Sequence, residues 1–513
     1  MSTAERLDIL IVGAGLSGIG TAHHLKSAHP DRSFAILESR PQIGGTWDLF
    51  RYPGIRSDSD MHTLGYRFRP WTDAKSIADG ASILDYIRST ATESGIDAHI
   101  RFGHRVVAAD WSAATSTWRV KVIAGETTRF FECSFLVMCS GYYSYDAGYT
   151  PELKGIHTFE GRVVHPQQWP EDLDHSGRDI VVIGSGATAV TLVPALAKSA
   201  AHVTMLQRSP TYIMSVPSQD VIANTLRRLV GSQLSYRLTR WKNVATAWAV
   251  YELSRRCPSI IKAMVRKNVA KHLPVADVDA HFTPSYQPWD QRLCAAPDGD
   301  LFRSLKSGRA SVVTDTIDTF TDVGIRLTSG TTLRADIVVT ATGLDLLFFG
   351  GIDLRVNGNR VNVAEAFAYK GMMLSDVPNF VYTLGYTNSS WTLKADLVSQ
   401  YLCRLIDFMD SHGYTSCVPH PDDLTMPRRP LFDFEAGYVK RALDRMPSSG
   451  PRAPWRQGMN YIEDVITMRH RAIDDGVLQF HRTEHAQPGQ DPSTAENHRP
   501  DPSHCETGVS RRS

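Results

Sequence analysis

The chain has 513 residues, of which 42% are hydrophobic and 21% are charged, and its formal net charge is +1. This balance is typical of a globular protein of several domains and disfavours a chain built to bind nucleic acid. Seven cysteines without a CxxC spacing favour reduced thiols in a cytoplasmic protein over a zinc ribbon or a dithiol centre. No signal-peptide pattern opens the chain, and no apolar run reaches the roughly 18 residues of a membrane-spanning helix.

The chain begins with the pattern of a dinucleotide site. Segment 7–20 is a short apolar run, followed by Gly13-x-Gly15-x-x-Gly18 and a stretch compatible with a helix. Gly13 permits a tight turn, Gly15 lets a pyrophosphate approach the helix amino terminus, and Gly18 allows the helix to pack against the strand. Glu38 ends the next apolar run, where a carboxylate accepts hydrogen bonds from ribose hydroxyls. The alternative is a plain glycine turn with a surface glutamate.

The same pattern recurs in segment 178–190, with the motif Gly184-x-Gly186-x-x-Ala189. The following apolar run ends at Arg208 and Ser209, where the first repeat has its acid. A cation at that place suits a 2′-phosphate, so we predict NADPH rather than NADH in this second site. The alternative is an arginine that faces only solvent.

A second pair of similar segments supports the duplication. FLVMCSG ends at Gly141 and DIVVTATG ends at Gly343, and both predict a buried strand followed by a turn of small residues. The sequence therefore predicts an α/β protein with two Rossmann-like dinucleotide-binding domains. Hydride transfer between a nicotinamide and a flavin is a use for such a pair, and the order of the sites favours FAD in the first.

The segment between the second glycine motif and its closing strand is predicted to be a helical insertion. It carries eleven basic residues between positions 221 and 272, and Glu252 is the single acid there. Two interpretations stay open: peripheral contact with a membrane surface or another anionic partner, or a solvated helical insertion. The expected organisation is an FAD-binding domain, first part, at 1–148; a linker with the NADPH-binding domain, first part, at 149–216; the helical insertion at 217–288; the NADPH-binding domain, second part, at 289–375; an FAD-domain return segment at 376–483; and a disordered tail at 484–513.

Two longer motifs carry a resemblance to a known family. Segment 159–170 reads F-x-G-x-x-x-H-x-x-x-W-P and contains His165, Trp169 and Pro170. It resembles, without a mismatch, the fingerprint of type I Baeyer–Villiger monooxygenases. Segment 44–58, which contains Gly45, Trp47 and Asp58, is similar to a second motif of the same family. Within the family, segments 284–308 and 383–397 resemble most the ethionamide-activating mycobacterial monooxygenases.

The resemblance implies the reaction. Members of this family use FAD and NADPH to insert one oxygen atom from O2 into ketones, giving esters or lactones through a C4a-peroxyflavin, and oxidation of sulfides or thioamides is compatible with the same chemistry. Related flavin monooxygenases that act on nitrogen or sulfur share the histidine but usually lack the Trp-Pro ending. A monooxygenase of heteroatoms therefore stays an alternative, as does a nucleotide-binding redox protein that performs no oxygenation.

The resemblance also implies roles for single residues. The flavin-side arginine of the family falls on Arg292, and its carboxylate partner falls on Asp58. His165 is expected to act in proton transfer, to serve as a hinge between the nucleotide domains, as we favour, or to be a buried histidine without a special role. Trp47 is expected near the flavin, beside the glycine pair that ends at Gly45, with packing in the core as the alternative. The lysine that usually precedes the arginine is Gln291 here, so NADPH selectivity would depend more on Arg208.

Overall fold

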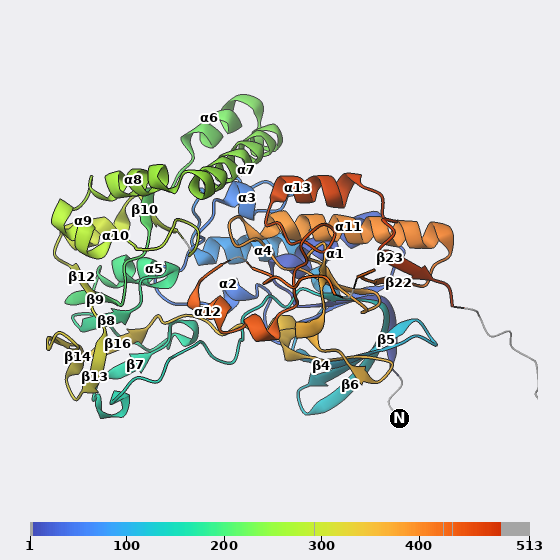
Figure 1. The fold of residues 1–513 in the computed structure, drawn as a ribbon, viewed down its shortest axis with the longest axis horizontal. Coiled ribbons are helices and arrows are strands. Elements are labelled where there is room, and N and C mark those ends of the chain that lie inside the picture. The colour runs from blue at the N-terminus through green and yellow to red at the C-terminus, as the bar shows by residue number, and fades with distance from the viewer. Residues whose placement is uncertain (1–3, 292, 424, 433, 484–513) are drawn as a thin grey trace, which may run out of the picture.

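The computed structural model describes residues 4–291, 293–423, 425–432 and 434–483. The expected disordered tail at 484–513 lies outside the described residues. Two sheets with helices on them make up most of the chain, one on each side of the view in Figure 1. This arrangement confirms the predicted α/β class with two Rossmann-like units.

The first sheet has nine strands, in the order β18-β17-β4-β5-β6-β1-β2-β3 with β21 beside β6. Its parallel part joins β1 to β2 and β6, and β4, β5 and β6 form an antiparallel meander. The strands are β1 (Glu5–Val12), β2 (Phe34–Leu37), β3 (Ile100–Arg101), β4 (His104–Ser112), β5 (Thr117–Ala124), β6 (Thr127–Met138), β17 (Asp353–Val356), β18 (Asn359–Arg360) and β21 (Phe380–Tyr382).

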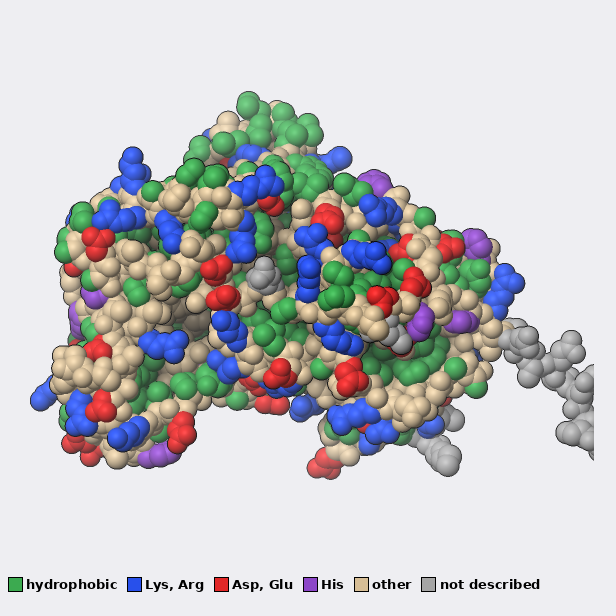
Figure 2. Space-filling model, in the orientation of Figure 1, with side chains coloured by type: hydrophobic (Ala, Val, Ile, Leu, Met, Phe, Trp, Pro, Cys, Tyr) green, Lys and Arg blue, Asp and Glu red, His purple; other side chains and the backbone are tan. Residues whose placement is uncertain are grey.

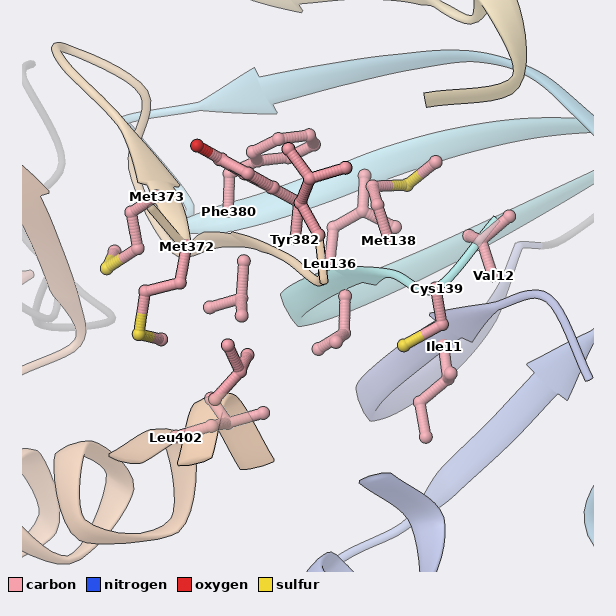
Figure 3. Packing of buried hydrophobic residues seen from close by; sticks show 14 of the residues in the cluster. Ile11, Val12, Leu136, Met138, Cys139, Met372, Met373, Phe380, Tyr382 and Leu402 are labelled. Carbon is pink, nitrogen blue, oxygen red and sulfur yellow. The ribbon is translucent and has the colours of Figure 1, made fainter. Parts of the chain in front are cut away.

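Helices α1 (Leu16–Ala28), α4 (Gly80–Glu93) and α11 (Trp391–His412) belong to this unit, and α1 packs against α11. Figure 3 shows Phe380, Tyr382 and Met138 on one face of this sheet and Leu402 of α11 on its other side. Residues 9–12 of β1 are apolar without alternation because both neighbours of the strand are parallel strands in a sheet that is covered on its faces. Shorter helices nearby are α2 (Thr46–Leu49), α3 (Met61–Leu64), α12 (Gly437–Lys440) and α13 (Tyr461–Val465).

The second sheet is parallel and has five strands, in the order β12-β9-β8-β16-β7. Its core is separate from that of the first unit and includes Val182, Leu192 and Phe302. A small antiparallel sheet, β13-β14-β15, lies beside it. The elements are β7 (Arg162–Val164), β8 (Asp179–Ile183), α5 (Ala187–Leu196), β9 (His202–Gln207), α10 (Asp300–Lys306), β12 (Ala310–Thr314), β13 (Ile317–Thr321), β14 (Gly324–Leu327), β15 (Thr332–Arg334) and β16 (Ile337–Thr340).

The expected insertion is helical, as predicted. It contains α6 (Val221–Val230), α7 (Ser232–Arg256), α8 (Pro258–Val269) and α9 (Val275–His281). Strands β10 (Ile213–Val216) and β11 (Cys294–Pro297) pair in parallel on either side of it. None of the helices in the described ranges is long and apolar enough to cross a membrane.

The chain returns to the first sheet earlier than the sequence suggested. Strand β17 pairs with β4, so segment 353–356 belongs to the first sheet rather than to a second domain that extends to residue 375. The prediction was wrong here because a short strand does not reveal its partner. The remaining strands are β19 (Ala368–Tyr369), β20 (Met373–Leu374), β22 (Ser416–Pro419) and β23 (Leu478–His481).

Candidate active site

The first glycine turn joins β1 to α1 and has the geometry that its residues predict. Gly13 has φ of +104°, and a Cβ there would lie 2.6 Å from the carbonyl oxygen of Cys139. A Cβ on Gly18 would overlap the carbonyl oxygen of Gly13. The turn and the close packing of α1 therefore need glycine at both positions.

A cradle lies between this turn and the glycine pair of segment 44–58. Gly15 and Gly45 face each other, since a Cβ on Gly45 would lie 3.1 Å from the Cα of Gly15. No side chain caps the first turn of α1, which leaves its amides for an anion. Trp47 is half-buried at the start of α2 and packs against the first core. The cradle suits a pyrophosphate, and side chains on these glycines would narrow it.

Glu38 is held beside the same turn. Its side chain is buried, with 4% of the residue exposed. Its two carboxylate oxygens accept hydrogen bonds from the amides of Ala14 at 2.8 Å and Arg40 at 2.9 Å. Burial raises the pKa of this carboxyl above its ordinary value, although both amides oppose that shift. A carboxylate fixed at the end of β2 is placed to accept hydrogen bonds from the hydroxyls of a ribose.

The second glycine turn repeats the first. Gly184 has φ of +129°, and a Cβ there would overlap the carbonyl oxygen of Ala341, the counterpart of Cys139. The amide of Gly184 donates to the carbonyl oxygen of Leu206 at 2.8 Å. In the same way, the amide of Gly13 donates to the carbonyl oxygen of Leu37 at 2.8 Å. A Cβ on Gly186 would meet no atom of the described residues within 4 Å, and no side chain caps α5. This open turn suits a second nucleotide phosphate.

Arg208 and Ser209 follow β9 directly, at the same edge of the sheet as the second glycine turn, and both are exposed. Within the described residues, the Arg208 guanidinium makes no hydrogen bond or ion pair. No described residue therefore competes with a 2′-phosphate for this guanidinium. Gln291 is half-buried near β11, and Arg292 lies outside the described residues.

Asp58 is exposed and lies in a loop after segment 52–54, next to the buried Ser57. The hydroxyl of Tyr52 is close enough to sense its charge: burial is the larger cause that raises the pKa of Tyr52, and the Asp58 carboxylate adds to it. Tyr52 itself packs in the core of the second unit although it belongs to the first part of the chain. Asp58 therefore sits in a loop that reaches from one nucleotide unit toward the other.

His165 lies in the linker between the units, after β7. Its Nε2 bonds to the carbonyl oxygen of Gly343 at 3.1 Å, and its Nδ1 accepts from the amide of Gln167 at 3.1 Å. This pattern assigns the proton of a neutral ring to Nε2. Burial lowers the pKa of His165 below its ordinary value. A Cβ on Gly148 would overlap the ring, so the linker folds closely around it.

These contacts favour the hinge interpretation of His165. The ring joins the linker to the turn after β16, and both ring nitrogens are engaged. A small pocket between the two units is lined by His165 together with Phe50, Tyr52, Gln167, Thr188 and Leu344. Trp169 packs against the second core and not into this pocket. The histidine therefore lies where the two nucleotide units meet.

The sequence did not reveal a cavity of about 550 Å³ beside α7. Val244, Trp248 and Tyr251 of α7 form one wall, and segments 387–389 and 456–463 form others. The chain leads from this wall to the first glycine turn: Trp391, two residues after segment 387–389, donates its indole N–H to Ser17 of α1 at 2.7 Å. The walls come from distant parts of the chain, so no local motif marks them.

The family comparisons agree with this geometry. The family model described as flavin-binding monooxygenase-like matches residues 72–373, and the one described as NAD(P)-binding Rossmann-like domain matches residues 11–77. The chain is 54% identical over 478 residues to the FAD-containing monooxygenase EthA of Mycobacterium tuberculosis, covering 93% of this chain and 98% of that protein. It is 53% identical to EthA of Mycolicibacterium smegmatis, covering 93% and 97% of the two chains.

Solved structures share the fold. The complex of OTEMO with FAD and NADP matches at a TM-score of 0.68 and 23% identity, covering 81% of this chain and 87% of that chain. A closed crystal structure of cyclohexanone monooxygenase matches at a TM-score of 0.68 and 21% identity, covering 82% and 87%. These likenesses agree with the resemblance drawn from the motifs. This chain therefore belongs to the flavin-binding monooxygenase-like family and is a flavin monooxygenase similar to mycobacterial EthA.

Proposed function

We propose that the chain is an FAD- and NADPH-dependent Baeyer–Villiger monooxygenase. One oxygen atom of O2 enters a ketone to give an ester or lactone, and the other leaves as water with two electrons and a proton from NADPH and a further proton from solvent. The relatives are named FAD-containing monooxygenases, and one solved structure of this fold holds FAD and NADP. Oxidation of sulfides or thioamides at the same site is compatible with this proposal.

The observation that carries the proposal is the pair of matched glycine turns on either side of one linker. The linker contains the fingerprint segment 159–170, and His165 lies between the two units. Trp169 and Pro170 complete the fingerprint and favour ketone oxygenation over a monooxygenase that acts on heteroatoms alone. The related enzymes share the histidine but usually lack that ending.

The chain's own residues would hold both nucleotides. Gly15 and Gly45 leave room for the FAD pyrophosphate, and Glu38 accepts the ribose hydroxyls. Gly184 and Gly186 serve NADPH in the same way, with Arg208 and the neighbouring Ser209 on the 2′-phosphate. When bound, FAD supplies the hydride acceptor and the group that activates oxygen. Arg292 would place a permanent charge beside the developing anion, and Asp58 would orient that arginine.

The cavity beside α7 is the proposed ketone site. Its volume of about 550 Å³ is in the range of small-molecule sites. Trp248, Tyr251 and Met459 give it apolar surface for a carbon skeleton, and charged side chains such as Glu252 and Arg456 line other parts of the wall. Asp290, two residues before Arg292, pairs with Arg255 of the cavity wall at 2.9 Å. This ion pair links the wall to the segment that carries the proposed catalytic arginine.

We place the reaction in the cytoplasm. The six described cysteines form no disulfide, in keeping with a reducing compartment. NADPH is supplied there as well.

The test is product analysis under O2 labelled with heavy oxygen. The purified holoenzyme receives NADPH and a panel of linear, cyclic and aryl ketones with one thioether. An ester with one labelled atom supports the proposal. Labelled sulfoxide without any ester favours the heteroatom alternative. Consumption of NADPH with labelled peroxide as the sole product across the panel overturns oxygenation.

A matched pair of variants sharpens this test. In the Arg292→Ala variant, NADPH should still reduce the bound FAD. The variant should form no ester, because the charge beside the developing anion is gone. Arg334→Ala removes an exposed arginine on β15 and should behave as the unmodified enzyme. Equal ester formation by both variants would remove Arg292 from the proposed mechanism.

A further inference from the structure

Helices α6 and α7 form a hairpin that projects from the molecule (Figure 1) and displays apolar side chains to solvent. Leu229 is 74% exposed and Trp241 is 52% exposed. Segment 221–253 holds more than half of the exposed large hydrophobic side chains in the described part of the chain. Figure 2 shows this apolar surface where α6 and α7 lie, at the top of the view.

The exposed residues of α7 form one stripe. Leu234, Leu238, Trp241, Ala245 and Trp248 follow one another at intervals of four and three positions and are all exposed. This spacing places them on a single helical face. An apolar stripe on a helix usually packs against a core. The stripe of α7 is exposed instead, and another side of the helix faces the protein.

The opposite side of α7 anchors the hairpin. Arg240 is buried and donates to the carbonyl oxygens of Thr63 at 3.1 Å and Gly65 at 2.7 Å. The hydroxyl of Tyr236 donates to Tyr66 at 3.0 Å. The hairpin is therefore held in place with its apolar stripe directed outward.

The charges around the stripe have one sign. Glu252 is the single acid between residues 221 and 269, and Arg256 pairs with it at 3.1 Å. Arg228 and Arg237 are exposed beside Leu229 and Leu238, and neither makes a hydrogen bond or ion pair within the described ranges. Six other basic residues of the segment are engaged within the protein and do not contribute free charge: Arg227, Arg240, Lys242, Arg255, Arg256 and Arg266.

We propose that the α6–α7 hairpin docks on an anionic phospholipid surface. The apolar stripe and Leu229 enter the interface between headgroups and acyl chains, and Arg228 and Arg237 contact the lipid phosphates. A second copy of the chain fits this surface less well, because a symmetric contact would bring the unpaired arginines together without acids to match them. An apolar ridge that projects, flanked by cations, is complementary to a bilayer surface.

The position of the hairpin gives the docking a consequence. Trp248 belongs both to the stripe and to the wall of the cavity beside α7. Docking would therefore bring the cavity close to the lipid surface, where apolar compounds concentrate. This consequence rests on the proposed function, whereas the docking itself does not.

Flotation of the FAD-loaded enzyme with vesicles tests the docking. We expect binding to vesicles of phosphatidylcholine with phosphatidylglycerol at low ionic strength and little binding to phosphatidylcholine alone. The double variant Arg228→Gln/Arg237→Gln should weaken binding by about fivefold for each charge removed. The double variant Leu234→Gln/Leu238→Gln should weaken it by about tenfold or more for each leucine. Val323→Gln, an exposed apolar residue on a turn far from the hairpin, is the matched control and should bind as the unmodified enzyme does.

Absence of flotation with anionic vesicles at low ionic strength overturns the proposal. So does equal flotation of all three variants. A stable dimer that the leucine variant dissociates, without lipid binding, would assign the stripe to a second copy instead. Because flotation does not measure oxygenation, these outcomes are independent of the ketone assay.

Discussion

At the scale of single residues, Glu38 and Arg208 occupy matching places in the two repeats and carry opposite charges. We expect Arg208→Ala to raise the KM for NADPH by about tenfold or more and to leave the KM for NADH unchanged, because a charge-assisted contact to the 2′-phosphate is lost. Steady-state kinetics with both donors measure this. Arg334→Ala is the control for general charge loss. An equal change for both donors would assign the arginine another role.

His165 makes two hydrogen bonds that a neutral ring satisfies. We expect His165→Ala to slow the reduction of bound FAD by NADPH by about tenfold, with FAD content unchanged, because the linker loses its contact with Gly343. Stopped-flow absorbance measures the reduction. Gly148→Ala should slow it as well while keeping the histidine, since the new Cβ would displace the ring. Gly437→Ala, whose Cβ would meet Arg441 at an ordinary 3.5 Å, should not.

The pKa of His165 also predicts a pH dependence. Its value in the folded protein lies below the ordinary 6.5, so the unfolded chain binds the proton first as the pH falls. The contribution of His165 to the free energy of unfolding is therefore complete above pH 6.5 and decreases below it, until the folded-state pKa is reached. Denaturant titrations of the enzyme and of His165→Gln across this range should diverge toward neutral pH. Parallel curves would contradict a histidine that is held neutral.

At the scale of elements, Arg240 connects the helical insertion to the first unit. Its guanidinium also contacts Asp396 of α11 at 3.2 Å, and Asp396 is in turn 3.2 Å from His24 of α1. We expect Arg240→Met to lower the free energy of unfolding by about 3–5 kcal/mol, because a buried carboxylate and several carbonyl oxygens lose a partner. Urea unfolding followed by circular dichroism measures this. Arg237→Met, one turn away and exposed, should change it by less than about 0.5 kcal/mol.

The contrast between these two arginines shows what the sequence could and could not reveal. The glycine turns and their following strands were predictable because backbone geometry restricts which residues fit there. No comparable restriction shows whether a basic residue on a helix is buried or exposed, so Arg237 and Arg240 cannot be told apart in the sequence. The same reason hid the cavity, whose walls come from α7 and distant loops, and the pairing of β17 with β4. Local patterns predicted elements, and contacts between distant segments decided the rest.

At the scale of the whole molecule, the two nucleotide units have separate cores and meet at the small pocket that His165 lines. The chain passes between them in the linker that contains β7 and again after β16, and His165 contacts the second crossing at Gly343. Tyr52 adds a contact from the first unit into the second core. Either site could therefore be lost without unfolding the other, while hydride transfer requires both in one arrangement.

The two glycines of the second turn separate these contributions. Gly186→Ala places a Cβ in open space, so the free energy of unfolding should change by less than about 0.5 kcal/mol. The same methyl group would occupy the approach of the NADPH pyrophosphate, so the Kd for NADP⁺ should rise by about tenfold or more, while FAD content and reduction by dithionite stay unchanged. Gly184→Ala would instead press on the Ala341 carbonyl and should destabilise the second unit even without nucleotide. Titration calorimetry gives the Kd for NADP⁺ of each variant, and scanning calorimetry gives its thermal unfolding. If Gly186→Ala bound NADP⁺ normally, the open turn at the start of α5 would not be the phosphate site, and the symmetry between the two repeats would extend to the fold alone.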